Sequence, residues 1–269
     1  MILIGEKLNS SIPSTRKAIE GRDIDTIQSL ARRQAEAGAE WLDLNAGMFV
    51  GDEARTLAWL AETTAAVTDT GLVLDSPDPS VLETVVPQLA SRRLILNSAT
   101  LDPARLEPML ALALEYGTGL VALPIRGRRL PESVAEQVDI AEELLSAAQA
   151  AGLPEDRIYL DMLVSAAAID TDAPSRALAF ARHMRTGHPD LHLTGGISNV
   201  SYGLPGRRPI NAAFLSASIQ AGVDAPILDV LDTNMLHVLT ASVMIAGQDE
   251  YCADYLAFYR SRIAGTHST

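Results

Sequence analysis

The chain has 269 residues, of which 48% are hydrophobic and 20% are charged, and it carries a formal net charge of -13 at pH 7. This length suits one large α/β barrel or two small domains. The apolar content is ample for a core, although no apolar run is long enough to cross a bilayer. The acidic excess would repel a phosphate backbone, so we expect neither a nucleic-acid nor a membrane partner.

Short β-rich segments alternate with helix-period segments along the whole chain. Helices are predicted from Asp23 to Ala37, Asp102 to Tyr116, Pro131 to Ala151 and Asp249 to about Ile263, because acidic or proline-containing starts and glycine stops mark several of their ends. The strands, with a mean spacing of roughly 32 residues, are predicted at Ile2–Glu6, Trp41–Asn45, Leu72–Asp75, Leu94–Asn97, Leu120–Leu123, Ile158–Asp161, Leu191–Thr194 and Ala225–Leu228.

Eight βα units at this spacing predict a single-domain α/β protein with the (β/α)₈, or TIM, barrel fold. The strands are almost wholly apolar, as expected where the barrel interior covers one face and helices cover the other. We expect the barrel and a C-terminal helix, packed on its outside or across its base, to occupy residues 1–263. Residues 264–269 are expected to form a flexible tail.

The only cysteine and the first residues bear on the cell compartment. Cys252 alone can form no intrachain disulfide, and it leaves too few thiolates for a zinc site. The segment that begins with Met1 has no basic region, extended apolar region or small-residue cleavage site typical of an export signal. These features favour a cytoplasmic protein, and we expect no tightly bound metal.

The apolar strands end, one after another, in residues with polar side chains. All strands of such a barrel point their carboxyl ends to the same face, which is where active sites lie. Any one of these residues could instead cap a helix or close a turn, but repetition at corresponding positions favours a shared cavity. The residues are Glu6, Asn45, Asp75, Asn97, Asp161 and Asn199.

The chemistry of these side chains suits a flat, polar heterocycle. Ionised aspartates only accept hydrogen bonds, whereas asparagine both donates and accepts, so Asp75, Asn97 and Asp161 could bind the aminopyrimidinone edge of a pterin. The glycines at 195 and 196 permit a close approach of the backbone, and Asn199 could then face the ring. Arg207 and Arg208 could meet an anion at the rim, although a solvated helix start explains Arg208 equally well.

Several motifs, most of them at predicted strand ends, carry a family resemblance. They are Gly5-Glu6-Lys7-Leu8-Asn9, Leu42-Asp43-Leu44-Asn45-Ala46-Gly47, Leu74-Asp75-Ser76, Leu96-Asn97-Ser98, Leu160-Asp161, Gly196-Ile197-Ser198-Asn199-Val200-Ser201 and Arg207-Arg208-Pro209-Ile210-Asn211. With these motifs the chain resembles, nearly collinearly from Met1 to about Ile263, the methyltetrahydrofolate:corrinoid methyltransferases of the pterin-binding family.

The resemblance implies a homodimeric barrel enzyme that moves a methyl group between N5 of tetrahydrofolate and the cobalt of a cobalamin or other corrinoid. The corrinoid would be supplied by a separate, transiently bound protein, and the direction of transfer stays open. By the same resemblance Asn199 contacts N5 and is the catalytic residue. The pterin-binding set is then Asp75, Asn97, Asp161, Gly196, Ser198, Asn199, Tyr202 and Arg207, with Glu6 and Asn45 as further residues of the cup.

Tyr202 departs from the family pattern, because acetogenic members carry a polar amide at this position. The contact that Tyr202 makes with the pterin, and its effect on the direction of transfer, stay open.

Two other functions are compatible with parts of this sequence, and one motif is misleading. Dihydropteroate synthases share the barrel and pterin cup, but they have an Asn-Val-Thr-Pro-Asp-Ser-Phe loop where this chain continues from Glu6 to Ser11 with Lys-Leu-Asn-Ser. A folate-binding subunit without catalytic activity is a further alternative. The segment from Asp190 to Gly195 matches a cobalamin-binding motif, but too little chain follows for a second domain, so His192 is interpreted as a strand residue.

Overall fold

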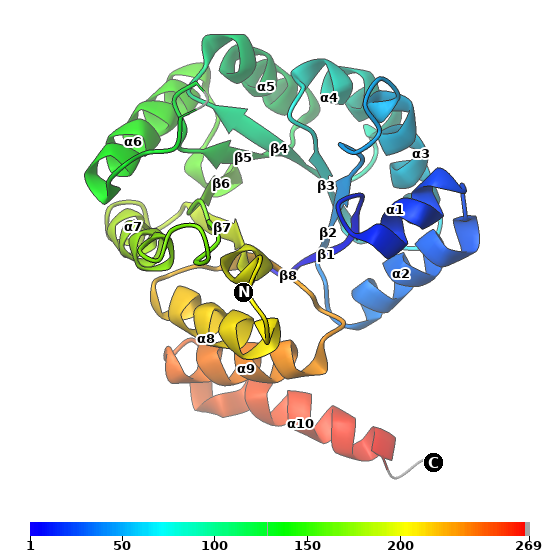
Figure 1. Cartoon of the computed structure of the whole chain (residues 1–269), viewed down its shortest axis with the longest axis vertical. Coiled ribbons are helices and arrows are strands. Elements are labelled where there is room, and N and C mark those ends of the chain that lie inside the picture. The colour runs from blue at the N-terminus through cyan, green and yellow to red at the C-terminus, as the bar shows by residue number, and fades with distance from the viewer. Residues whose placement is uncertain (128, 267–269) are drawn as a thin grey trace.

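The computed structural model describes residues 1–127 and 129–266, with side chains described as far as Arg260. Eight parallel strands close into a barrel in sequence order, with helices around it (Figure 1), so the predicted fold is confirmed. The strands are β1 Ile4–Asn9, β2 Trp41–Asn45, β3 Gly71–Asp75, β4 Leu94–Thr100, β5 Gly119–Leu123, β6 Ile158–Asp161, β7 His192–Gly196 and β8 Ala225–Leu228.

The helices surround the strands. They are α1 Pro13–Glu20, α2 Ile24–Glu36, α3 Glu53–Ala65, α4 Pro79–Val85, α5 Pro103–Tyr116, α6 Val134–Ala151, α7 Ala173–Gly187, α8 Arg207–Gln220, α9 Thr233–Ile245 and α10 Ala253–Thr266. Short 3₁₀ turns, η1 Val86–Leu89, η2 Glu155–Arg157, η3 Ile197–Ser201 and η4 Glu250–Cys252, occupy four of the connections. No helix in the described ranges is both long and apolar enough to span a membrane.

Two helix starts differ from the prediction because a side chain caps the helix further along. Ser133 accepts a hydrogen bond from the Glu136 N–H, so α6 begins at Val134 rather than at Pro131. The carboxylate of Asp249 accepts the N–H groups of Asp254 and Tyr255, so α10 begins beyond the short turn η4.

The C-terminal helix lies outside the barrel. α10 packs along α9 and extends away from the ring of helices (Figure 1). It continues to Thr266, past the expected end near Ile263. Positions 267–269 of the expected tail lie outside the described residues.

Three strands run further at their carboxyl ends than predicted. β4 continues to Thr100, so Asn97 lies within it and not at its end. β1 continues to Asn9 although the sequence pattern ended it at Glu6, and its pairing with β2 shifts register between Gly5 and Leu8. β7 continues to Gly196, two residues beyond Thr194. A polar residue or a glycine interrupts the apolar pattern in each of these strands, but the strand continues beyond it, in β1 and β4 after a shift of register. Glu6 therefore lies within β1 and not at its end.

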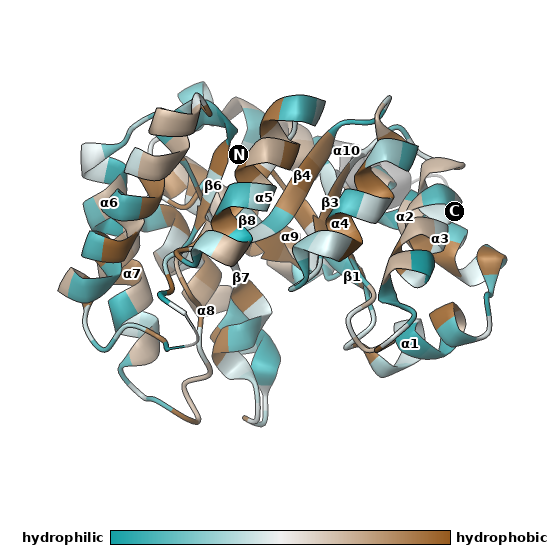
Figure 2. Cartoon of the chain, turned by 90° about the horizontal axis from the view of Figure 1, so that it is seen from above, coloured by the Kyte–Doolittle hydropathy of each residue, from teal (hydrophilic) through white to brown (hydrophobic). Residues whose placement is uncertain are grey.

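The apolar core forms two regions. The larger lies between the strands and the surrounding helices, and the strands are mainly apolar in Figure 2. The smaller fills the lower barrel interior. Since alternate residues of a strand share a face, Asp75, Asn97 and Asp161 each lie one step above a buried residue of this smaller core, at Val73, Ile95 and Tyr159.

Candidate functional site

A cavity of ≈ 790 Å³ lies at the carboxyl ends of the strands. It is large enough to hold a bicyclic ring system with room above it. Among the predicted site residues, Glu6, Asp75, Asn97, Asp161, Gly196, Ser198, Asn199, Tyr202 and Arg207 line this cavity. Asn45 is not among the lining residues, but its side-chain amide is hydrogen-bonded to Asp75, which is.

The carboxyl groups of Asp75 and Asp161 lie deep in the cup, with part of each open to the cavity. Asp75 Oδ2 accepts a hydrogen bond from Asn45 Nδ2 at 2.9 Å, and Asp161 Oδ1 accepts one from the Leu163 N–H at 2.6 Å. Burial raises the pKa of each group to about 6. At pH 7 both are therefore mainly ionised, and each presents a further oxygen to donors on a ligand.

Asp43 on β2 is a site residue that the sequence reading missed. It lines the cavity but is only 3% exposed, and its Oδ2 accepts a long hydrogen bond of 3.4 Å from Asn9 Nδ2. Burial, followed by the nearby charges of Asp75 and Glu6, raises the pKa of Asp43 well above its ordinary value. The protonated form of the Asp43 carboxyl is therefore favoured, compared with an exposed aspartate, inside the cup.

A signal for Asp43 was present in the sequence. It stands two residues before Asn45 on the same strand, so alternation turns both side chains toward the barrel interior. A prediction based on the last residue of each strand does not include Asp43, whose carboxyl group lies one layer deeper in the barrel.

The carboxyl ends of β1, β7 and β8 are joined by polar contacts. Ser198 Oγ donates to Glu6 Oε2 at 2.8 Å, and burial raises the pKa of Glu6 despite this bond. Lys7 Nζ lies 2.5 Å from Asp229 Oδ2, and both residues line the cavity. Lys7 and Asp229 were also missed by the sequence reading. This side of the cup carries both charges, unlike the side formed by β3, β4 and β6.

The turn η3 places Asn199 over Gly196. A Cβ atom at Gly196 would lie 2.8 Å from Asn199 Nδ2, closer than such atoms approach, so glycine is required for this position of the amide. Arg207 supports the same turn from α8, because its Nη2 donates to the Ser198 carbonyl at 2.6 Å and its Nε donates to Ser201 Oγ at 2.9 Å. Arg207 therefore contributes to the cavity wall mainly by holding the turn.

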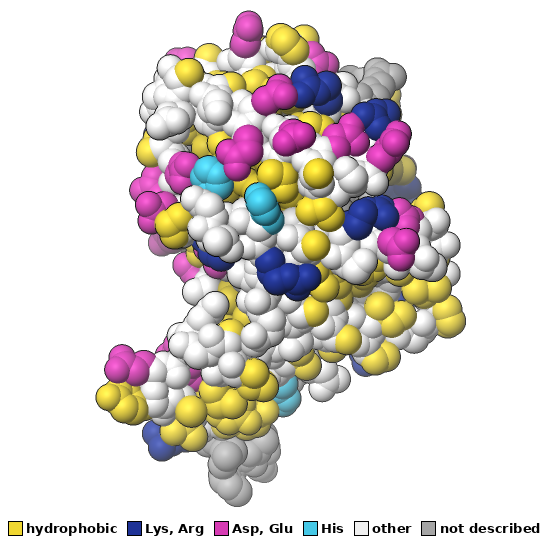
Figure 3. Space-filling view, turned by 90° about the vertical axis from the view of Figure 1, so that its left-hand side faces the viewer, with side chains coloured by type: hydrophobic (Ala, Val, Ile, Leu, Met, Phe, Trp, Pro, Cys, Tyr) yellow, Lys and Arg dark blue, Asp and Glu magenta, His cyan; other side chains and the backbone are white. Residues whose placement is uncertain are grey.

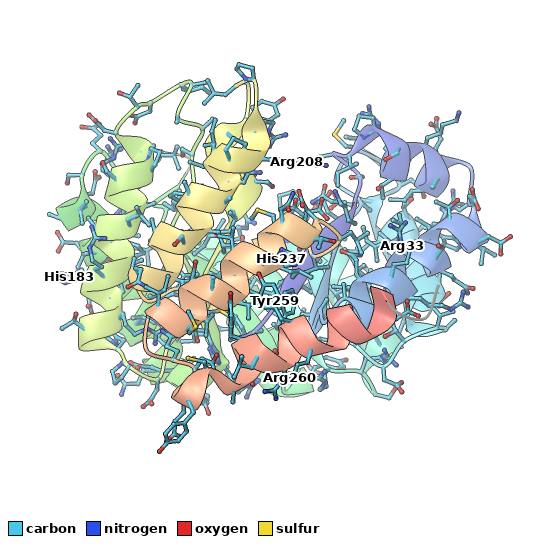
Figure 4. The ribbon with its side chains drawn as sticks, turned by 90° about the horizontal axis from the view of Figure 1, so that it is seen from below. Arg33, His183, Arg208, His237, Tyr259 and Arg260 are labelled. Carbon is cyan, nitrogen blue, oxygen red and sulfur yellow. The ribbon has the colours of Figure 1, made fainter. Side chains whose placement is uncertain are left out.

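Two residues lie at the outer rim. The Tyr202 residue is 68% exposed, and its ring is available to whatever covers the mouth of the cup. The Arg208 side chain is 81% exposed and lies 3.3 Å from Asp232, near the start of α8 (Figure 4). This exposure fits the solvated helix start considered for Arg208.

His192 lies at the amino end of β7, on the side of the barrel opposite to the cup. Its Nδ1 is 2.7 Å from Asp224 Oδ2, and its ring stacks on Tyr159 with 4.7 Å between the ring centroids. The interpretation of His192 as a strand residue is confirmed.

The parallel barrel and its cup of carboxylates and amides define the class: a barrel that holds a flat polar heterocycle at its carboxyl face. A family model described as "Pterin binding enzyme" matches residues 5–229. The chain belongs to this pterin-binding enzyme family, as the sequence motifs indicated.

Two relatives show which enzymes of this family the chain is similar to. The chain is 32% identical over 262 residues to "Methylcorrinoid:tetrahydrofolate methyltransferase" of Eubacterium limosum, covering 97% of this chain and 96% of that protein. It is 28% identical over 241 residues to "Methionine synthase" of Mycobacterium tuberculosis (strain ATCC 25618 / H37Rv), but spans only 20% of that longer protein. The predicted resemblance to corrinoid methyltransferases is thereby confirmed.

Solved structures agree on the fold. Dihydropteroate synthase from Xanthomonas albilineans, with 4-aminobenzoic acid, superposes with a TM-score of 0.66 at 18% identity, covering 91% of this chain and 92% of that one. A dihydropteroate synthase described as FolP from "Colstridium difficile" gives a TM-score of 0.70 at 17% identity, covering 91% and 96%. At these identities the likeness concerns the barrel alone.

Proposed function

We propose that this protein is an enzyme that moves a methyl group between N5 of tetrahydrofolate and the cobalt of a corrinoid carried by a separate protein. The observation that carries the proposal is the 32% identity, over nearly the full length of both chains, to an enzyme named for methylcorrinoid and tetrahydrofolate. That name suggests methylcorrinoid as donor, although one transition state serves both directions.

The donor and acceptor pattern of the cup supports a bound pterin. Asp75 and Asp161 offer carboxylate oxygens, and Asn97 lies on β4 in register with Asp75. A pterin presents N–H donors and a carbonyl along one edge, which these three side chains complement. In this pose the aminopyrimidinone ring binds at β3, β4 and β6, and N5 faces Asn199 on the other side of the cup.

The chemical difficulty lies at N5. When the methyl group leaves N5 the nitrogen gains a proton, and when the methyl group arrives the nitrogen loses one. The corrinoid supplies the metal that gives or takes the methyl group. The Asn199 amide accepts or donates a hydrogen bond that strengthens as the charge on N5 changes, which favours the transition state over the bound substrate.

A spectroscopic assay tests the function and separates it from its rivals. The protein is mixed with tetrahydrofolate and methylcobalamin, then with methyltetrahydrofolate and cob(I)alamin, and the cobalamin spectrum is followed. We expect methyl transfer in both mixtures. Formation of dihydropteroate from a pterin diphosphate and an aromatic amine would identify a synthase instead. Tight folate binding without either reaction would identify a binding subunit.

We also propose that the protein is a cytoplasmic homodimer that meets its corrinoid protein transiently. The exposed apolar side chains of Ile245 at the end of α9, Tyr251 in η4 and Leu256 on α10 support a dimer. Figure 3 shows hydrophobic side chains on the surface at the lower end of the molecule, where α9 and α10 lie. His237 and Tyr259 pack between these two helices with ring centroids 5.3 Å apart, which fixes α10 in place (Figure 4).

A sedimentation experiment tests the dimer. Leu256→Asp places a charge on the α9–α10 surface, so we expect this variant to sediment as a monomer while the unmodified protein sediments as a dimer. Val50→Asp, which changes a residue that is 92% exposed near the mouth of the cup, is the matched control and should stay dimeric. A monomeric unmodified protein would contradict the proposal.

A further inference from the structure

A chain of hydrogen bonds runs behind the cup and ends on Asp75. The Met48 N–H donates to Ser10 Oγ at 3.2 Å, and Ser10 Oγ donates to Asn45 Oδ1 at 2.8 Å. Asn45 Nδ2 then donates to Asp75 Oδ2 at 2.9 Å, and the Gly47 N–H gives Asn45 Oδ1 a second donor at 3.1 Å. These hydrogen bonds thus connect the loop after β2 to the carboxyl group of Asp75 in the cavity.

The orientation of the Asn45 amide is fixed by its neighbours. Turned over, its NH₂ group would face two donors, the Ser10 hydroxyl and the Gly47 N–H, and its oxygen would face a carboxylate. Ser10 is fully buried and already accepts the Met48 N–H, so its own proton is directed to Asn45. Only one orientation of the Asn45 amide gives every donor and acceptor in this hydrogen-bond network a partner.

We propose that Asn45, oriented by Ser10 and the Gly47-Met48 turn, is a positioning residue that keeps Asp75 an ionised acceptor aimed at the pterin. This inference rests on the proposed function. Asn45 occupies Oδ2 of Asp75, so Oδ1 is the oxygen that meets a ring N–H. A protonated Asp75 would present a hydroxyl in place of an acceptor, and the pterin edge would lose its partner.

Other charged groups act on Asp75 from each element around it. Burial raises the pKa of Asp75 to about 6, the Asn45 bond lowers it, Glu53 on α3 raises it and Arg105 on α5 lowers it. Asp43 on β2 and Asp161 on β6 also interact electrostatically with Asp75. Without the Asn45 bond no other side chain donates a hydrogen bond to Asp75 among the described residues, so its pKa rises further.

Asn45→Ala tests the inference through two readouts. Selective ¹³C labelling of aspartate carboxyl groups lets NMR follow the titration of Asp75 in the free protein. We expect its midpoint to rise by about one pH unit, since a hydrogen bond to a charged group contributes energy of that order. Calorimetry with tetrahydrofolate should show about a twofold weaker affinity at pH 7, because the ionised fraction of Asp75 falls from about nine-tenths to about one half. The loss should grow toward about tenfold near pH 5 and shrink toward pH 8.5.

A second variant and a control sharpen the test. Ser10→Ala removes only the hydroxyl that orients Asn45, so it should shift the Asp75 midpoint in the same direction by a smaller amount. If Asn45→Ala does not fold, the Asp75 midpoint in Ser10→Ala tests the inference by itself. Val50→Ala changes an exposed residue of the same loop and should leave both the midpoint and the affinity unchanged.

Two outcomes would overturn the inference. An Asp75 midpoint unchanged in both variants, with affinity reduced equally at every pH, would show that Asn45 only supports the structure. Failure of the unmodified protein to bind tetrahydrofolate would reject the proposed function, and the pterin role of Asn45 with it. The NMR titration would still report the effect of Asn45 on Asp75 separately.

Discussion

Burial raises the pKa of the Asp161 carboxyl to about 6 from an ordinary value of 3.8. The folded protein therefore holds the Asp161 proton more tightly than the unfolded chain does. This carboxyl destabilises the fold increasingly as pH rises from about 4 to 6, and above pH 6 the full penalty of about 3 kcal/mol applies. The ionised form that binds a ring N–H is thus retained at the expense of stability.

Asp161→Asn should remove this penalty. An asparagine keeps an oxygen for the Leu163 N–H, so we expect the free protein to gain about 1–3 kcal/mol at pH 7 and nothing at pH 4, measured by urea unfolding at both pH values. The same variant should bind tetrahydrofolate more weakly. Asp69→Asn, at a fully exposed carboxyl that forms a salt bridge with Arg92, should leave stability nearly unchanged at both pH values. Equal stability changes at the two pH values would refute the electrostatic explanation.

Asn199 is the residue expected to act at N5. Asn199→Ala should lower the rate of methyl transfer by on the order of 10–10³-fold, because a single preorganised polar group contributes an effect of this size. Folate affinity should fall much less, since the ring is held by other side chains. Single-turnover kinetics with saturating methyltetrahydrofolate would measure the step directly, and a rate near that of the unmodified protein would remove Asn199 from the mechanism.

At the scale of the element, the turn η3 must keep Asn199 above the ring. Gly196→Ala should leave the fold intact, because the backbone φ of -74° suits alanine, but its Cβ would displace the Asn199 amide. We expect about a tenfold lower turnover at nearly unchanged melting temperature. Gly187→Ala, where a Cβ meets no atom within 4 Å, is the matched control and should retain full activity. Full activity of the Gly196 variant would show that Asn199 can act from another position.

The strands and most helices could be predicted because apolar periodicity and capping residues act locally. Asp23 and Asp102 cap α2 and α5 as their positions in the sequence indicate. Asp75 and Asp161 were found because each is the polar residue that ends an apolar strand. Asp43 was missed because its place inside the barrel depends on the pairing of whole strands. Lys7 was missed because β1 continues past Glu6, and its contact with Asp229 joins the first and last strands.

At the scale of the whole molecule, the proposed reaction passes a methyl group between two proteins, which requires a cup that is open at its mouth. The polar layer of the barrel interior faces this opening, and the smaller apolar core closes the barrel beneath it. The fold therefore allows access from one end only. In the proposed reaction, the corrinoid protein covers the carboxyl face of the barrel so that its corrinoid reaches N5.

A crystal structure of the protein with methyltetrahydrofolate tests the central claim most directly. We expect one pteridine ring in the cavity, with its aminopyrimidinone edge within hydrogen-bond distance of Asp75, Asn97 and Asp161 and with N5 beside Asn199. A ring bound elsewhere, or bound with its aminopyrimidinone edge away from these carboxylates, would contradict the assignment.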